Sequence, residues 1–135
     1  MEKKKEILLL EDDQFHRSLL AEGLEEYYDY RVIKVQSLEE AEAELKVASP
    51  DLLLLDCVLG DNRFQVIEWA EEVRRRPSLA RIPILFVTAY YQEMEERARE
   101  IENSDILAKP FTFEDVTQKI QGLLSGRPRS ADART

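Results

Sequence analysis

Carboxylates follow two short apolar segments that have the length of buried strands. Glu11, Asp12 and Asp13 come directly after residues 7–10, and Asp56 comes directly after residues 52–55. If the chain brings these groups together, their repulsion raises carboxylate pKa values unless a divalent cation neutralises them. Mg²⁺ fits best, because it prefers octahedral oxygen ligation and commonly takes one or two carboxylates with a phosphate. Either group by itself is typical of solvated turn residues.

Two further polar residues follow apolar segments in the second half of the chain. Thr88 follows residues 82–87, and Lys109 follows residues 106–108. A single threonine at a strand end is usually just a good β former, and a single lysine is usually solvated. At the same edge of a sheet as Asp56, however, a hydroxyl and an ammonium would be ligands for a phosphate group. The order of the elements decides whether these groups meet.

Five segments of strand length alternate with five segments of helical spacing. The strand segments are residues 7–10, 31–35, 52–55, 82–87 and 106–108. The first helical segment carries a series at four-residue spacing: Phe15, Leu19, Gly23 and Tyr27. Ser37 with Glu40 predicts a capping box, and Thr112 predicts the cap of the last helix, with acidic residues in its first turn.

This alternation predicts an α/β fold. Residues 52–55 are apolar on both faces, which indicates a parallel sheet covered by helices on each side. We expect a doubly wound five-stranded parallel sheet, (βα)5, in the flavodoxin-like order 2-1-3-4-5. In that order ligands bind beyond the carboxyl ends of strands 1 and 3, which is where Asp12 and Asp56 would meet.

The length of 135 residues, 44% of them hydrophobic, suits one domain with one core, which we place at residues 5–124. Residues 125–135 include glycine, proline and three arginines but no large apolar side chain, which predicts a disordered tail or linker stub.

The net charge of the chain bears on which kinds of partner the domain can bind. A net charge of -9 would repel nucleic acid and anionic lipid surfaces. No apolar stretch approaches the roughly 20 residues that span a membrane, and the chain has one cysteine. We therefore expect no nucleic-acid or membrane partner for this domain, and the cytoplasm as its location.

The polar residues also occur in the pattern of a known family. From about residue 5 to residue 124, the sequence resembles the receiver domain of bacterial response regulators. The shared signature is an acidic pair after the first strand, an aspartate after the third, a threonine followed by Ala89 after the fourth, and Lys-Pro-Phe at residues 109–111 after the fifth.

The resemblance implies a role for each residue of the signature. Four groups would hold Mg²⁺: Glu11, Asp12, Asp56 and the backbone carbonyl of Val58. Asp56 would be the phosphorylated residue, Thr88 would bind the phosphoryl group, and Lys109 would pair with it. The peptide bond between Lys109 and Pro110 is a candidate for the cis form.

The implied function is that of a phosphoacceptor in a two-component phosphorelay. Asp56 would take a phosphoryl group from a phosphohistidine on a sensor histidine kinase or a histidine phosphotransfer protein. The domain would catalyse its own phosphorylation and dephosphorylation, yet act as a signalling switch rather than as an enzyme. Its surface would signal to a downstream effector protein or to an output domain beyond this sequence, with dimerisation on phosphorylation as a further expectation.

The sequence departs from the family pattern at two places. The loop after Asp56 is one residue short, and Arg63 replaces the family's glycine. Ile106 stands where the family has an aromatic switch residue, so coupling through a rotating ring is altered or absent. We expect output to depend on the loop after strand 4 and on the fourth helix instead.

Two positions bear on the lifetime of an acyl phosphate. Val58 and Tyr90 lie two residues beyond Asp56 and Thr88. In receivers, side chains at these positions tune how readily water reaches the phosphoryl group, and neither valine nor tyrosine orients water well. The hypothesis is slow self-dephosphorylation.

The main alternative is a degenerate receiver, which would act as a phosphorylation-independent protein-interaction module. A haloacid dehalogenase-type hydrolase needs a second carboxylate where Val58 stands, and a flavodoxin-type flavin carrier needs a phosphate loop where this chain is acidic. His16 and Cys57 are expected to have surface and packing roles, respectively.

Overall fold

The computed structural model describes residues 3–126. Its elements are β1 (Glu6–Leu10), α1 (Gln14–Tyr27), β2 (Arg31–Val35), α2 (Leu38–Val47), β3 (Leu52–Asp56), α3 (Gln65–Arg74), a short 3-10 helix (Pro77–Leu79), β4 (Ile84–Thr88), α4 (Tyr91–Arg99), β5 (Ser104–Ala108) and α5 (Phe113–Leu124). All neighbouring strands are parallel, in the order β2-β1-β3-β4-β5. The predicted fold class and strand order are confirmed. The predicted tail lies almost entirely outside the described residues.

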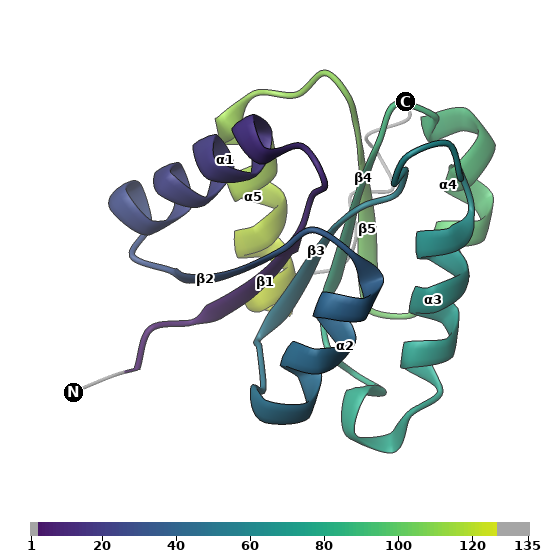
Figure 1. The fold of residues 1–135 in the computed structure, drawn as a ribbon, viewed down its shortest axis with the longest axis horizontal. Helices are drawn as coiled ribbons and strands as arrows, with labels where there is room; N and C mark the ends of the chain where they lie inside the picture. The colour runs from purple at the N-terminus through teal and green to yellow at the C-terminus, as the bar shows by residue number, and fades with distance from the viewer. Residues whose placement is uncertain (1–2, 127–135) are drawn as a thin grey trace.

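The sheet separates two apolar cores. Figure 1 shows α1 and α5 on one face of the sheet and α2, α3 and α4 on the other. The side chains of β3 alternate between them: Leu53 and Leu55 pack toward α2, α3 and α4, whereas Leu52 and Leu54 pack toward α1 and α5. This central strand is inaccessible on both faces, so its carboxyl end is held rigidly.

Helix starts follow the predicted capping residues, with one difference. At α5, the Thr112 hydroxyl accepts from the Asp115 N–H (3.0 Å) while the Asp115 carboxylate accepts from the Thr112 N–H (2.9 Å). At α2, Ser37 accepts from the Glu40 N–H, but the Glu40 carboxylate accepts from the N–H of Gln36 rather than that of Ser37. The capping box predicted at Ser37 is therefore only half formed.

Two strand boundaries differ from the prediction. β4 begins at Ile84 rather than at Ile82, because Pro83 has no N–H to donate to the ladder. β5 begins two residues early, at Ser104, since its polar residues find buried partners. The Ser104 hydroxyl donates to backbone carbonyls at the end of α4, and Asp105 pairs with Lys119 of α5 at 3.1 Å.

The four-residue series that indicated the first helix does not form its buried face. Phe15, Leu19 and Tyr27 are 69%, 59% and 75% exposed, whereas Ala21 and Leu24 are buried against the sheet. α1 has apolar residues on both sides, so spacing alone could not identify the buried side. Gly23 faces α5: a Cβ there would lie 2.7 Å from a ring carbon of Phe113.

The orientation of α1 predicts how two leucine substitutions change the free energy of unfolding. Leu24→Ala should lower the free energy of unfolding by about 2–5 kcal/mol, because it leaves a cavity in the core. The matched change Leu19→Ala should lie within about 0.5 kcal/mol of the parent, because that side chain is largely solvated. Urea unfolding measures both, and equal losses would contradict the orientation of the helix.

Among residues 3–126, no helix is long and apolar enough to cross a membrane.

Candidate functional site

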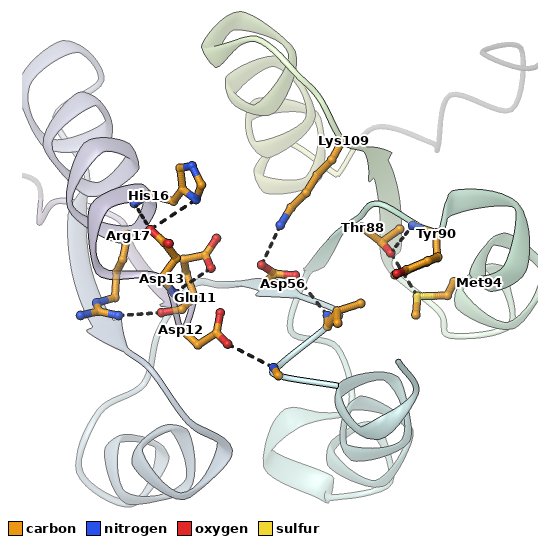
Figure 2. A network of polar contacts seen from close by, with 12 residues as sticks. Glu11, Asp12, Asp13, His16, Arg17, Asp56, Thr88, Tyr90, Met94 and Lys109 are labelled. Carbon is orange, nitrogen blue, oxygen red and sulfur yellow. Dashed lines mark hydrogen bonds and ion pairs between the residues drawn. The ribbon is translucent and has the colours of Figure 1, made fainter. Parts of the chain in front are cut away.

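The three carboxylates of the predicted metal site lie together at the carboxyl edge of the sheet. β1 and β3 are paired in register, with Leu10 opposite Leu55, so the residues that follow them meet. One oxygen from each of Glu11, Asp12 and Asp56 lies within 4.8 Å of the others. Asp13 points away from this group (Figure 2), because its side chain caps α1 by accepting from the His16 N–H at 2.9 Å.

The cluster is unequally buried, and this affects its protonation. Asp56 is 3% exposed and Glu11 is 8% exposed, whereas Asp12 faces solvent. Burial, followed by the charge of Asp56, raises the pKa of Glu11 to about 7. The site therefore carries more negative charge than it can hold without a cation or a proton.

Backbone N–H groups orient two of the carboxylates. The Val58 N–H donates to Oδ1 of Asp56 at 3.1 Å, and the Gly60 N–H donates to Oδ2 of Asp12 at 3.2 Å. Gly60 has a φ of 62°, a left-handed conformation that glycine adopts without strain and that shapes this tight turn.

The donor set fits Mg²⁺. Val58 lines the same hollow as the three carboxylates, an open volume of about 340 Å³. Three carboxylates with room for a backbone carbonyl and water make an all-oxygen set, which is what Mg²⁺ prefers. The family resemblance implies these three carboxylates and the backbone carbonyl of Val58 as ligands, and the three carboxylates are close together in the structure.

Lys109 reaches the same carboxylate from the end of β5. Its Nζ lies 2.8 Å from Oδ2 of Asp56, and Figure 2 shows the side chain pointing across the hollow toward it. Burial lowers the pKa of Lys109, but the hydrogen bond and charge of Asp56 outweigh this and leave the pKa above its ordinary value. The ammonium is therefore charged. The peptide bond between Lys109 and Pro110 is cis, as the sequence suggested.

Thr88 ends β4 beside Asp56, but its hydroxyl is turned toward α4. Oγ1 accepts from the Tyr90 N–H at 2.9 Å and lies 3.3 Å from Sδ of Met94 (Figure 2). The side chain is fully buried. Its predicted role as a phosphoryl ligand therefore requires a rotation away from these two partners.

The predicted tuning residues divide into two groups. Val58, Ala89 and Tyr90 line the hollow around Asp56. Ile106 is 2% exposed and packs in the core between the sheet and α4, so it acts on the hollow only through its neighbours.

Two residues set aside at the sequence level can be placed. His16 lines the hollow, with Nδ1 3.4 Å from Asp13, close to the acidic residues that precede it in the sequence. Cys57 is inaccessible, and burial raises its pKa to about 12, so the thiol stays protonated and packs as an apolar group.

A parallel five-stranded sheet with this acidic cluster and a facing lysine at its carboxyl edge defines a class of doubly wound α/β domain. The family described as the response regulator receiver domain matches residues 7–121. The chain belongs to that family, which serves two-component signalling.

Curated relatives and solved structures agree with this family assignment. The chain is 35% identical over 120 residues to the transcriptional regulatory protein YvcP of Bacillus subtilis (strain 168), covering 87% of this chain and 48% of that one. It is 32% identical to the phosphate regulon transcriptional regulatory protein PhoB of Rhizobium meliloti (strain 1021), covering 87% and 51%. The receiver domain of a signal transduction histidine kinase from Syntrophus aciditrophicus superposes with a TM-score of 0.76 at 27% identity, covering 90% and 91%. The chain thus spans about half the length of the curated relatives it matches.

The raised pKa of Glu11 makes Mg²⁺ binding depend on pH, because the proton must leave before the carboxylate can bind a metal. Calorimetric titration should give an affinity about tenfold weaker at pH 6 than at pH 8, the ratio expected for one group titrating near pH 7.

The raised pKa of Glu11 also makes the stability of the metal-free protein depend on pH. Stability from this group is present below its ordinary pKa of 4.5 and is lost as the pH rises through about 7.

For the Mg²⁺ titration, the control is Asp13→Asn, next to the cluster, which should keep the pH dependence of Mg²⁺ binding. An affinity that is constant from pH 6 to pH 8 would rule out Glu11 as the coupled ligand.

Proposed function

We propose that this domain is an active phosphoacceptor, and that Asp56 takes a phosphoryl group from a phosphohistidine on a sensor histidine kinase or a histidine phosphotransfer protein. The observation that carries the proposal is the position of Asp56. Its carboxylate lies at the floor of an open hollow, 2.8 Å from Lys109 and within 4.8 Å of Glu11 and Asp12. A nucleophile, a cation and a set of metal ligands thus converge on one point.

The reaction needs little acid-base catalysis. An oxygen of Asp56 would attack phosphorus in line, forming the acyl phosphate bond while the phosphorus–nitrogen bond breaks. The donor imidazole keeps the electron pair of that bond and takes a proton from solvent. Val58 holds the attacking carboxylate through its N–H, and the Lys109 ammonium offsets charge on the transferred oxygens.

Mg²⁺ would be held by Glu11, Asp12, Asp56 and the carbonyl of Val58. When bound, it would supply charge neutralisation for the crowded carboxylates and the phosphoryl oxygens. This neutralisation matters here because the cluster already holds Glu11 partly protonated near neutral pH.

The new phosphoryl group would act as the signal. Thr88 would rotate to donate its hydroxyl to a phosphoryl oxygen, giving up its contacts with Tyr90 and Met94. Both contacts lie at the start of α4, so their loss would bias the surface formed by α4, β5 and α5. The two arrangements would pre-exist, with the phosphoryl group shifting their populations.

The proposed setting follows from the family and the charge. Residues 5–124 would form the receiver, acting in the cytoplasm as a signalling switch rather than as an enzyme. A downstream effector protein or an output domain would respond, and dimers could form on phosphorylation.

The alternative is a degenerate receiver, suggested by Arg63 and Ile106. The complete acidic cluster with its paired lysine favours the phosphorylated function.

Intact-protein mass spectrometry tests the proposal. Incubation with acetyl phosphate should give a single phosphoryl adduct that requires Mg²⁺ and is absent from Asp56→Asn, since that amide is not a nucleophile. Asp13→Asn is the matched control, because that aspartate caps α1 outside the cluster. If no variant forms an adduct and the wild type also fails to bind beryllium fluoride, the degenerate alternative stands.

The residues that line the hollow lead to a second prediction, on the lifetime of the phosphorylated state. Val58→Asn combined with Tyr90→Glu should shorten the lifetime of the phosphorylated state severalfold, because polar side chains at these positions can orient water for attack. Decay of the adduct measures the effect, with the exposed Val47→Asn as control. An unchanged decay rate would refute the shielding hypothesis.

A further inference from the structure

Arg63 joins the two loops that flank the phosphoacceptor hollow. Its guanidinium carbon lies 4.1 Å from the centre of the Tyr90 ring, well inside the range of a cation–π contact. Its Nη1 also lies 3.2 Å and 3.1 Å from the two carboxylate oxygens of Glu93. Arg63 belongs to the loop between β3 and α3, whereas Tyr90 and Glu93 begin α4. We call these three residues the Arg63 clasp.

The clasp shares Tyr90 with the buried threonine of the site. The side chain of Tyr90 contacts Arg63 and lines the hollow, and its N–H donates to Oγ1 of Thr88 at 2.9 Å. A contact that fixes Tyr90 therefore favours the arrangement in which Thr88 faces α4 rather than Asp56.

The clasp also anchors the start of α4. Tyr90 is the N-cap residue of that helix, and its side chain makes no capping hydrogen bond there. Glu93, in the first turn, is held by Arg63 and lies where a negative charge interacts favourably with the helix dipole. Farther along, Arg97 ties α4 to Glu71 of α3, so the clasp is specific to the helix start.

The residue at the family's aromatic switch position gives the clasp its importance. Ile106 is buried and carries no ring, so it offers no aromatic side chain that could rotate with Thr88. The loop between β4 and α4 remains as the route from the hollow to the surface. Arg63 is the charged side chain that holds this loop from the opposite side of the hollow.

We propose that Arg63 is a positioning residue that acts through Tyr90 and opposes switching. The clasp stabilises the unphosphorylated arrangement of the β4–α4 loop, and it must loosen when Thr88 turns toward the phosphoryl group. This inference rests on the proposed phosphoacceptor function. Its consequence is that loss of the clasp raises the population of the arrangement that is ready for the phosphoryl group.

The experiment is a calorimetric titration of the full chain with beryllium fluoride in the presence of Mg²⁺. Arg63→Ala should bind the phosphoryl mimic roughly threefold to tenfold more tightly than the wild type, the effect of losing one exposed cation–π contact and one surface ion pair. Tyr90→Leu should tighten binding similarly, because it removes the ring on which the Arg63 guanidinium stacks. Thermal unfolding checks that each variant folds.

Two further variants sharpen the test. Arg76→Ala is the matched control, because that arginine is also ion-paired and partly exposed, but with Glu42 and Glu72 on the side of α2 and α3. It should leave the affinity unchanged. Combining Arg63→Ala with Tyr90→Leu should give less than the product of the two single effects, since both remove the same contact.

The outcomes separate the inference from the function on which it rests. Tighter binding by Arg63→Ala with unchanged Arg76→Ala supports the clasp, because general destabilisation would weaken binding instead. Wild-type binding with equal or weaker binding by Arg63→Ala overturns the inference and leaves the phosphoacceptor function intact. Failure of the wild type to bind overturns both.

Discussion

The charge on Asp56 is the constraint that organises this domain. The carboxylate ends β3, the strand buried on both faces of the sheet, where a charge without partners would be costly. Lys109 offsets part of that cost at 2.8 Å. Burial, and after it the charge of Asp56, raises the pKa of the nearby Glu11 to about 7. The parallel sheet thus crowds like charges at one edge. The resulting demand for positive charge supports the proposal that the hollow binds a divalent cation and a phosphoryl group.

Signal transmission depends on the side chains that surround this charge. Thr88 is a buried hydroxyl with two partners at the start of α4, so any rotation toward Asp56 changes the anchoring of that helix. The buried Ile106 offers no ring that could follow the rotation. Arg63, in the shortened loop, contacts the tyrosine that also bonds Thr88. In the proposed switch, coupling between the hollow and α4 would combine the buried contacts of Thr88 with the exposed and individually weak contacts of Arg63.

Much of the fold followed from local pattern. The alternation of apolar and helical segments predicted a parallel sheet covered on both faces, because parallel strands require crossover helices. The strand order was expected as the common doubly wound arrangement of five strands, and the structure has it. The predicted start of β5 was wrong because the polar residues there have partners in other elements. Ser104 and Asp105 look like loop residues in sequence, yet they are buried in β5 by contacts with α4 and α5. The series Phe15, Leu19 and Tyr27 indicated a helix but could not identify its buried side, because α1 has apolar residues on both sides.

The sequence by itself determined which chemical groups gather at the site. Residues that end parallel strands share one edge of the sheet, so Glu11, Asp12, Asp56 and Lys109 had to converge once the strand order was known. Only the tertiary structure decided how those groups and their neighbours are arranged. The direction of the Thr88 hydroxyl and the stacking of Arg63 on Tyr90 depend on side-chain torsions and on the approach of separate loops. Residue spacing fixes backbone position along an element, but it carries no information on contacts between elements that are distant in sequence.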